Sequence, residues 1–203
     1  MSPASSSSRL PRTHFDAAYY RRYYENPTTA VVTADLQKSE VAFVLAFCRH
    51  IGVAIKRFTD VGAGTGWWAA EFAKQYRDFE SIETFDASDD ACRVYGHKHI
   101  PVQELAGRAA DLVVCRDVLR YVPDAQIDRA ITRLDKKCRG VLYLHVVTSD
   151  DEVDEEASDM AGHFRTTAFY RRKLKAKGFR DCGMGLFASR RLATFDPFTL
   201  EYR

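Results

Sequence analysis

Length, composition and charge describe an ordinary globular chain. The 203 residues are 46% hydrophobic and 29% charged, so one domain can bury a core without disulfides or metals. The formal net charge of +2 creates no field that would favour nucleic acid or an anionic membrane. No apolar run approaches the ~18 residues of a membrane span. From the net charge and the absence of such a run, we expect neither a nucleic-acid partner nor a membrane.

The cysteine pattern indicates a reducing compartment. Cysteine occurs five times, an odd number, without a Cys-x-x-Cys pair and mostly among apolar neighbours: Cys48, Cys92, Cys115, Cys138 and Cys182. Histidine and cysteine never cluster at ligand spacing, so we expect no metal. The N-terminus shows no hydrophobic signal core. The prediction is a cytoplasmic protein, either a monomer or a homodimer.

The N-terminal region predicts a tail followed by an aromatic helix. The serine-rich residues 1–12 are expected to be disordered. Residues 13–26 predict a helix in which Tyr20, Tyr23 and Tyr24 share a face by i, i+3, i+4 spacing. These rings either pack on the sheet as core or form a lid that excludes water from a cofactor pocket.

A second helix is expected after Pro27, which would end the first. Asp35 is expected to cap it and Gly52 to close it. Its buried face would carry Val41, Val44, Leu45 and Cys48. We therefore predict one domain, in which residues 13–52 form a helical lid or cap and residues 53–203 form the cofactor-binding core.

A glycine-rich turn follows the first predicted strand. The stretch reads Phe58-Thr59-Asp60-Val61-Gly62-Ala63-Gly64-Thr65-Gly66-Trp67-Trp68. Its glycines let the backbone approach a ligand, and the helix that begins after them offers unpaired N–H groups. The spacing differs from the Gly-x-Gly-x-x-Gly of the dinucleotide fingerprint, and no Gly-Lys-Ser/Thr of a P-loop follows. Asp60 would repel a pyrophosphate but attract an ammonium or a sulfonium.

A second acid stands at the end of the next predicted strand. Residues 81–86 read as a strand that ends in Asp86, ~20 residues past Gly66, where an acid can accept hydrogen bonds from ribose hydroxyls. The alternative is that Asp86 begins a turn or caps the next helix. Ser88 can serve as that cap, which leaves Asp86 free and favours the ribose role.

A further motif is expected at the same edge of the sheet. Residues 99–105 predict a short, irregular third strand, and residues 110–116 predict an apolar central strand that is buried on both faces. The polar residues that follow, from Cys115 to Asp117, would face the same crevice as the glycine turn. The motif ends in Tyr121-Val122-Pro123-Asp124.

The remaining elements complete an alternating pattern of helices and strands. A helix is expected from Asp124 to Gly140, with Cys138 on its buried face, and a strand follows over 141–147. A last helix would be capped by Thr166 or Thr167 and closed by Gly178. Two strands, over 179–190 and 192–202, would end the chain. This order predicts an α/β doubly wound, mostly parallel sheet with an antiparallel last strand. The acidic run over 150–156, with Asp159, reads as a solvated loop or as a selector of a cationic substrate.

Two of these motifs resemble those of the class I S-adenosylmethionine-dependent methyltransferases, in particular a small bacterial-type domain. The stretch Asp60 to Gly66 is similar to motif I of that family, and residues 110–124 are similar to its fourth-strand motif. The resemblance implies a Rossmann-like sheet of seven strands with helices on both faces. It also implies S-adenosylmethionine as methyl donor and S-adenosylhomocysteine as product, without a metal.

The same resemblance implies roles for individual residues. Asp60 would act through the glycine-rich backbone on the methionyl ammonium, and Asp86 would bind the ribose. Gln103, Glu104 or Leu105 would lie around the adenine. The other cofactor-binding residues that it implies are Gly62, Ala63, Gly64, Gly66, Trp67, Ala87, Cys115 and Arg116. Tyr121, together with Tyr20, Tyr23 and Tyr24, is expected to contact the substrate or form the lid.

The expected reaction is in-line methyl transfer to the oxygen or nitrogen of a small molecule. The Asn-Pro-Pro-Tyr motif of amino-directed nucleic-acid methyltransferases is absent, since Cys115-Arg116-Asp117-Val118 stands there. A hydroxyl acceptor needs a general base, for which His145 is the first candidate, although the position favours a structural role as a hydrogen-bonded histidine at a strand end. The alternatives are a dinucleotide-dependent oxidoreductase and a cofactor-binding module without turnover.

Overall fold

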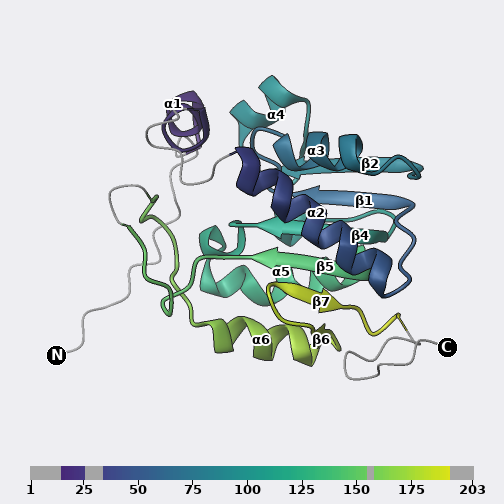
Figure 1. Ribbon diagram of the computed structural model, residues 1–203. Helices are drawn as coiled ribbons and strands as arrows, with labels where there is room; N and C mark the ends of the chain where they lie inside the picture. The colour runs from purple at the N-terminus through teal and green to yellow at the C-terminus, as the bar shows by residue number, and fades with distance from the viewer. Residues whose placement is uncertain (1–14, 26–33, 155–157, 193–203) are drawn as a thin grey trace.

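A central sheet organises the structure, a computed structural model that describes residues 15–25, 34–154 and 158–192. The described residues form a seven-stranded sheet of order β3-β2-β1-β4-β5-β7-β6 (Figure 1). The strands β1 to β5 pair in parallel, whereas β7 is antiparallel to both β5 and β6. The predicted doubly wound α/β fold is therefore confirmed.

The strands are short at the sheet's edges and long at its centre. Their bounds are β1 (Arg57–Val61), β2 (Ser81–Asp86), β3 (Lys98–His99), β4 (Ala110–Arg116), β5 (Cys138–His145), β6 (Arg180–Asp181) and β7 (Leu186–Ala188). The apolar run of β4 is buried from Ala110 to Cys115, because both of its faces are covered.

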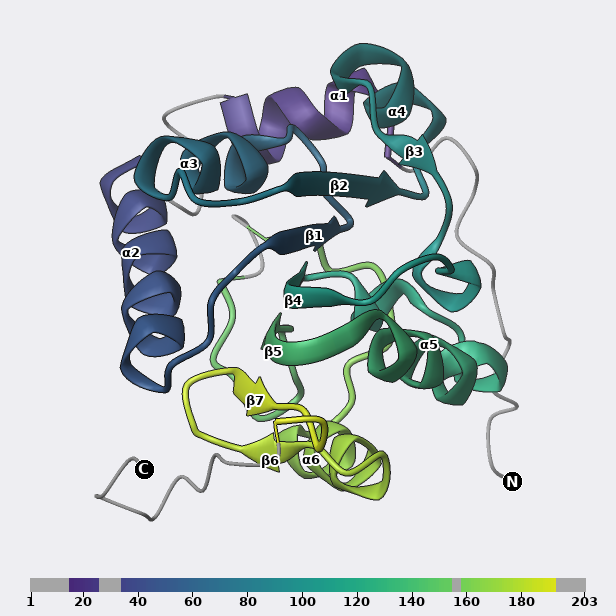
Figure 2. The same ribbon diagram turned by 90° about the vertical axis from the view of Figure 1, so that its right-hand side faces the viewer.

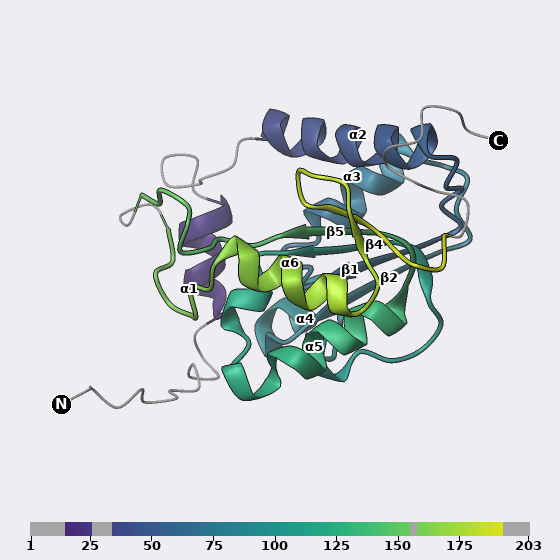
Figure 3. The ribbon, with the colours of Figure 1, turned by 90° about the horizontal axis from the view of Figure 1, so that it is seen from below.

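Helices cover both faces of the sheet, so the core forms two layers (Figures 2 and 3). One face carries α2 (Ala34–His50) and α3 (Trp67–Gln75), and the other carries α5 (Asp124–Lys137) and α6 (Thr167–Ala176). The shorter elements are α1 (Ala17–Tyr20), which continues as a π-helical turn η1 (Arg21–Glu25), α4 (Asp89–Tyr95), and the 3-10 turns η2 (Val102–Glu104) and η3 (Leu119–Tyr121).

The predicted buried face of α2 is confirmed, and it ties this helix to the sheet. Val41, Val44, Leu45 and Cys48 are buried in one cluster with Phe58 and Phe72. The segment 15–25 lies elsewhere, beyond the carboxyl ends of the parallel strands (Figure 1). Helix α2 therefore packs as part of the core, whereas α1 lies over the edge at which the strands end.

The strand order reverses between β1 and β4. From β1 the chain moves outward through β2 and β3, and it then returns to β4 on the other side of β1. In open α/β sheets, a crevice forms at the carboxyl edge at such a reversal. The pair Val61 and Cys115 marks that edge, and the glycine turn follows directly after Val61.

Several predicted boundaries are wrong, for local reasons. The third strand covers Lys98–His99 instead of 99–105, because Pro101 cannot donate to a strand ladder and the chain turns into η2. Helix α2 begins at Ala34, so Asp35 lies in its first turn instead of capping it. Ser88 and Thr166 do cap α4 and α6, as predicted, with side chains that accept from Ala91 N and Phe169 N.

The helix expected to end at Gly140 ends earlier. Helix α5 stops at Lys137, and Cys138, predicted to lie on its buried face, is the first residue of β5. Gly140 lies inside that strand, where a Cβ would come within 2.1 Å of the carbonyl oxygen of Asp111. This glycine therefore serves close strand approach, at a register shift in β4, instead of closing a helix.

The stretch predicted as one strand over 179–190 forms both β6 and β7. Positive φ angles at Gly183 (81°), Met184 (49°) and Gly185 (77°) reverse the chain between them. The strand expected over 192–202 lies outside the described residues beyond Leu192, as do the tail 1–12 and Pro27.

Candidate functional site

The glycine turn after β1 requires glycine at its first position. Gly62, Gly64 and Gly66 have φ angles of 72°, 55° and 76°. A Cβ on Gly62 would lie 2.1 Å from Val118 Cγ2, so the turn packs directly against the residues that follow β4. The backbone N–H of Gly62 donates to the carbonyl oxygen of Phe85, which fixes the turn to β2 as well.

Asp86 joins the glycine turn to the start of α4. Its Oδ2 accepts from the backbone N–H of Gly64 at 2.8 Å, and its Oδ1 accepts from the N–H of Ser88 at 2.8 Å. The carboxylate is nearly buried, with 8% of the residue exposed. It therefore sits at the bottom of the crevice, with both oxygens oriented by backbone donors.

His97 supports the same turn from behind, although no sequence pattern marks it as a site residue. Its Nε2 lies 2.9 Å from the carbonyl oxygen of Gly64, and its Nδ1 lies 2.9 Å from Thr84 Oγ1. Because a carbonyl only accepts, Nε2 must carry the proton in this pair. His97 also fills the space next to Gly66, where a Cβ would be 3.3 Å from its Cε1.

Asp60 lies beneath the turn and is almost fully buried. Burial, reinforced by the nearby charge of Asp86, raises the pKa of Asp60 to about 7. The backbone N–H of Ala69 and the charge of Arg116 oppose this rise of the pKa, and Oδ2 has no hydrogen-bond partner among the described residues. A buried acid with an unsatisfied oxygen favours a positive charge close by.

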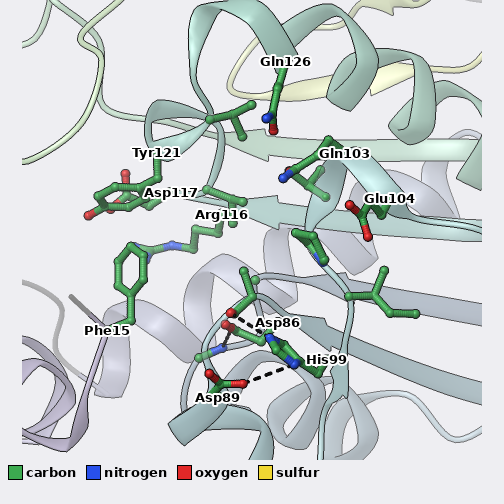
Figure 4. Close-up of a pocket in the computed structure, with 18 of the residues that line it drawn as sticks. Phe15, Asp86, Asp89, His99, Gln103, Glu104, Arg116, Asp117, Tyr121 and Gln126 are labelled. Carbon is green, nitrogen blue, oxygen red and sulfur yellow. Dashed lines mark hydrogen bonds and ion pairs between the residues drawn. The ribbon is translucent and has the colours of Figure 1, made fainter. Parts of the chain in front are cut away.

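A cavity of about 640 Å³ opens above Asp86 at the carboxyl edge of the sheet (Figure 4). One end is formed by Gln126 of α5 and by the residues that follow β3, namely Ile100, Pro101, Val102, Gln103 and Glu104. The floor is formed by Gly62, Gly64, Asp86, Ala87, Asp89 and His99. The other end, called here the aromatic end, is formed by Phe15, Tyr19, Tyr20, Arg116, Asp117, Val118, Tyr121, Val122 and Pro123.

Rings from distant parts of the chain meet at the aromatic end. The ring of Phe15 packs edge-on against Tyr19 and Tyr121, with centroids 5.1 and 4.8 Å apart. The hydroxyls of Tyr19 and Tyr121 lie 3.2 Å from each other. The N-terminal aromatic segment is therefore tied to the turn η3 at the aromatic end of the cavity.

The segment after β5 holds η3 from the other side. Arg120 Nη2 donates to the hydroxyl of Tyr121 at 2.6 Å, and that hydroxyl donates to Asp159 Oδ2 at 2.8 Å. Arg165 donates to the carbonyl oxygens of Leu119 and Val122. Two buried arginines therefore fix the orientation of Tyr121.

The acidic run after β5 is largely used within the protein. Asp159 accepts from Tyr121, Asp150 accepts from the N–H of Thr167 at the start of α6, and Asp151 accepts from the N–H and hydroxyl of Thr148. The solvated loop expected from sequence is confirmed for Asp150, Asp151, Glu152 and Asp154, which are exposed, whereas Asp159 is buried.

The predicted site residues fall into two groups. Those that line the cavity are Gly62, Gly64, Asp86, Ala87, Gln103, Glu104, Arg116, Tyr20 and Tyr121. Those outside the described lining are Asp60, Ala63, Gly66, Trp67, Leu105, Cys115, Tyr23 and His145. The side chain of Tyr24 lies outside the described part of the structure.

Three residues of the second group point away from the cavity for local reasons. Cys115 points into the core shared with α5 and is fully buried, whereas its neighbour Arg116 points toward the α2 side. Leu105 is also buried in that core. His145 follows Tyr143 on the α2 side of β5, one strand farther from the glycine turn, and its side chain is exposed outside the cavity.

Several lining residues were not singled out from the sequence, among them Phe15, Tyr19 and Gln126. Phe15 and Tyr19 belong to the aromatic segment, but helical spacing singled out its other tyrosines. Asp117, which was expected to face the crevice, does line the cavity; it directly follows β4 and has a positive φ of 55°, unusual for a residue with a side chain. Gln126 reaches the cavity from α5, and no sequence pattern marks it.

Two negative findings hold for the described ranges. No group of three or more His, Cys, Asp or Glu side chains within residues 15–25, 34–154 and 158–192 is arranged to hold a metal ion. In the same part of the chain, no helix has the length and apolar character needed to cross a membrane.

Most of this chain matches a known family of domains. A family model described as "Methyltransferase domain" matches residues 35–200. The ubiquinone biosynthesis O-methyltransferase of Acinetobacter baylyi is 33% identical over 105 residues, which covers 45% of this chain and 44% of that protein. The chain thus spans less than half the length of this curated relative.

Solved structures share the fold over nearly the whole chain. The sugar N-methyltransferase KedS8 from Streptoalloteichus sp. superposes with a TM-score of 0.60 and 15% identity, covering 94% of this chain and 97% of that one. The magnesium protoporphyrin IX methyltransferase from Synechocystis, with bound S-adenosylmethionine, superposes with a TM-score of 0.56 and 17% identity. The match covers 83% of this chain and 84% of that one. At these identities, the likeness shows a common sheet architecture.

Proposed function

The chain belongs to the methyltransferase domain family, and from this premise we propose that it is an S-adenosylmethionine-dependent methyltransferase whose methyl acceptor is a small molecule. The names of the relatives support this class, since they refer to ubiquinone biosynthesis, a sugar and a porphyrin. The predicted oxidoreductase alternative loses its basis, because the family is one of methyltransferases.

The observation that carries the proposal is one continuous cavity with two chemically different ends. Asp86 and the glycine turn form its floor, and the ring cluster of Phe15, Tyr19 and Tyr121 forms one end. A volume of about 640 Å³ is in the range of small-molecule sites and leaves room for a nucleoside-sized donor beside a small acceptor.

The residues present fit the donor. Asp86 has the position and the oriented oxygens to accept hydrogen bonds from two ribose hydroxyls. Gln103 and Glu104 lie at the end next to η2, where we place the adenine amino group. Asp60, beneath the turn, has a buried oxygen without a hydrogen-bond partner among the described residues, and its negative charge suits a ligand with a methionyl ammonium and a sulfonium.

The donor supplies an already activated methyl group, so the chain's task is to position the acceptor and exclude water. Tyr121 is held by Arg120 and Asp159, and Tyr19 contacts it from the N-terminal segment. This arrangement gives the aromatic end a fixed wall. Tyr20 covers the glycine turn, since its Cε1 lies 3.6 Å from where a Cβ on Gly64 would be.

An oxygen or nitrogen acceptor must also give up a proton. His145 is not among the described residues that line the cavity, and we propose Asp117 for this role. Asp117 lines the aromatic end, and burial raises the pKa of its carboxyl against the opposing charge of Arg120, whose Nε lies 2.9 Å from Oδ1. A raised pKa makes a carboxylate a stronger base.

Calorimetry and mass spectrometry test the proposed function together. We expect S-adenosylmethionine and S-adenosylhomocysteine to bind, and nicotinamide dinucleotides to give no thermal shift. A panel of phenols, aliphatic alcohols, sugars and amines should then yield at least one product heavier by a methyl group. Absence of binding to both sulfur compounds would overturn the donor site, and methylation of only protein or nucleic acid would overturn the acceptor class.

A further inference from the structure

The charges that line the cavity are strongly unequal. Four lining residues are acids, namely Asp86, Asp89, Glu104 and Asp117. Arg116 is the only arginine or lysine among the described residues that line it. An anionic group that enters this cavity therefore meets one permanent cation and several carboxylates.

The guanidinium of Arg116 is held along one edge. Its Nε donates to Glu40 Oε1 on α2 at 3.1 Å, and its Cζ lies 5.9 Å from the ring centroid of Trp67, the first residue of α3. The side chains of Arg116 and Glu40 are only 17% and 11% exposed. The pair is thus partly removed from water, and in this less polar surrounding the ion pair holds the guanidinium more firmly in one orientation.

The other edge of this guanidinium is available. Within the described residues, neither Nη1 nor Nη2 of Arg116 has a hydrogen-bond partner. The two nitrogens carry N–H groups in a planar fork that matches a carboxylate. Glu40 therefore orients the fork without occupying it.

The position of Arg116 relates this edge to the glycine turn. Cys115 pairs with Val61 in the sheet, so Arg116 stands beside Gly62 at the ends of β4 and β1. In Figure 4, Arg116 lies between Asp86 on the floor and the aromatic end with Asp117 and Tyr121. This is the opposite direction from Gln103 and Glu104, next to which the adenine is placed.

We propose that the Nη edge of Arg116 binds the carboxylate of the donor's methionyl group, while Glu40 and Trp67 hold the guanidinium in place. The inference rests on the proposed function, because it extends the same donor site. A donor whose ribose is on Asp86 and whose adenine is near Gln103 extends its amino-acid end toward Arg116. The carboxylate is the donor's only anionic group, and Arg116 is the only arginine or lysine among the described residues that line the cavity.

Paired ligands isolate this contact. Decarboxylated S-adenosylmethionine lacks only the carboxylate and keeps the sulfonium, the ammonium and the nucleoside. By calorimetry, the wild-type protein should bind S-adenosylmethionine ~10–100-fold more tightly than the decarboxylated compound. In Arg116→Gln this preference should fall to less than ~3-fold, with the loss confined to the ligand that has a carboxylate. Arg116→Lys should keep part of the preference, because a point charge remains without the planar fork.

Arg93→Gln is the matched control. Arg93 lies on the exposed side of α4, pairs with Asp90 and does not line the cavity, so this variant should keep the wild-type preference. A wild-type protein that binds both ligands equally, or an Arg116→Gln variant that keeps the full preference, would overturn the inference and leave the donor site intact. A wild-type protein that binds neither ligand would overturn the proposed function itself.

Discussion

The hydroxyl of Ser88 donates to the backbone carbonyl of Phe15 across 2.7 Å. The same hydroxyl accepts from the N–H of Ala91 as the N-cap of α4, and the N–H of Ser88 donates to Asp86. One serine thus connects the acid on the cavity floor with the N-terminal aromatic segment above it. Contacts at the proposed ribose site and the position of Phe15 are therefore linked through a single residue.

Ser88→Ala should weaken donor binding as well as lower stability. Loss of the cap alone costs ~0.5–2 kcal/mol of stability. The variant also releases Phe15, so we expect the Kd for S-adenosylhomocysteine to rise ~3–10-fold by calorimetry. Thr166→Ala is the matched control, because it removes the cap of α6, far along the chain from Asp86. Equal affinities in both variants would show that the link to Phe15 has no part in binding.

Asp86→Ala should remove most of the donor affinity. The carboxylate accepts charge-assisted hydrogen bonds, so its loss should weaken S-adenosylhomocysteine binding by ~1–3 kcal/mol. Asp89→Ala is a useful comparison, because Asp89 also lines the cavity but its side chain is 72% exposed. We expect it to change the Kd by less than ~3-fold. An unchanged affinity in Asp86→Ala would exclude Asp86 from the site.

His97 can be tested by two amides that differ in reach. Gln places its amide nitrogen near the position of Nε2 and can still donate to Gly64, whereas Asn reaches only the region of Nδ1 and Thr84. His97→Asn should therefore raise the Kd for S-adenosylhomocysteine ~3–10-fold, and His97→Gln should restore most of it. If both variants bind alike while their melting temperatures are also alike, His97 does not position the turn.

Asp60 should make stability depend on pH in a predictable direction. Its pKa is raised to about 7 by burial, so the folded protein holds this proton more tightly than the unfolded chain does. The resulting penalty begins above the unfolded pKa near ~4 and is complete above about 7. Asp60→Asn should therefore gain stability over the wild type as pH rises from ~5 to ~8, by on the order of 2–4 kcal/mol. Thermal unfolding across this range tests it, and a difference that stays constant with pH would contradict the raised pKa.

Sequence reasoning located the parts of the fold that depend on local pattern. The glycine turn, Asp86 at a strand end and the apolar run of β4 each have a physical signature within a few residues. Gly140 shows where such reasoning fails. A glycine after an amphipathic run is typical of a helix end, but here it allows close approach to Asp111, a residue of another strand. That reason exists only in the assembled sheet.

In the candidate site, too, residues within a local sequence pattern were predicted, whereas residues brought together only by the fold were not. Asp86 and Gly62 were identified from spacing, whereas His97, Gln126 and Tyr19 reach the site through packing between distant elements. His145 had the right position along the chain for a base, yet strand alternation and strand order place its side chain outside the cavity. A periodic pattern gives the face of a strand, but it does not say which strand ends lie next to the ligand.

Arg165 has a consequence for how such an enzyme changes over evolutionary time. It lies in the segment after β5, and its guanidinium fixes the backbone of Leu119 and Val122 on either side of Tyr121. Replacements in that segment can reshape the aromatic end without touching Asp86 or the glycine turn. Descendants of this chain can therefore acquire new acceptors while they keep the same donor site. Libraries aimed at new acceptors should be randomised first in the segment after β5.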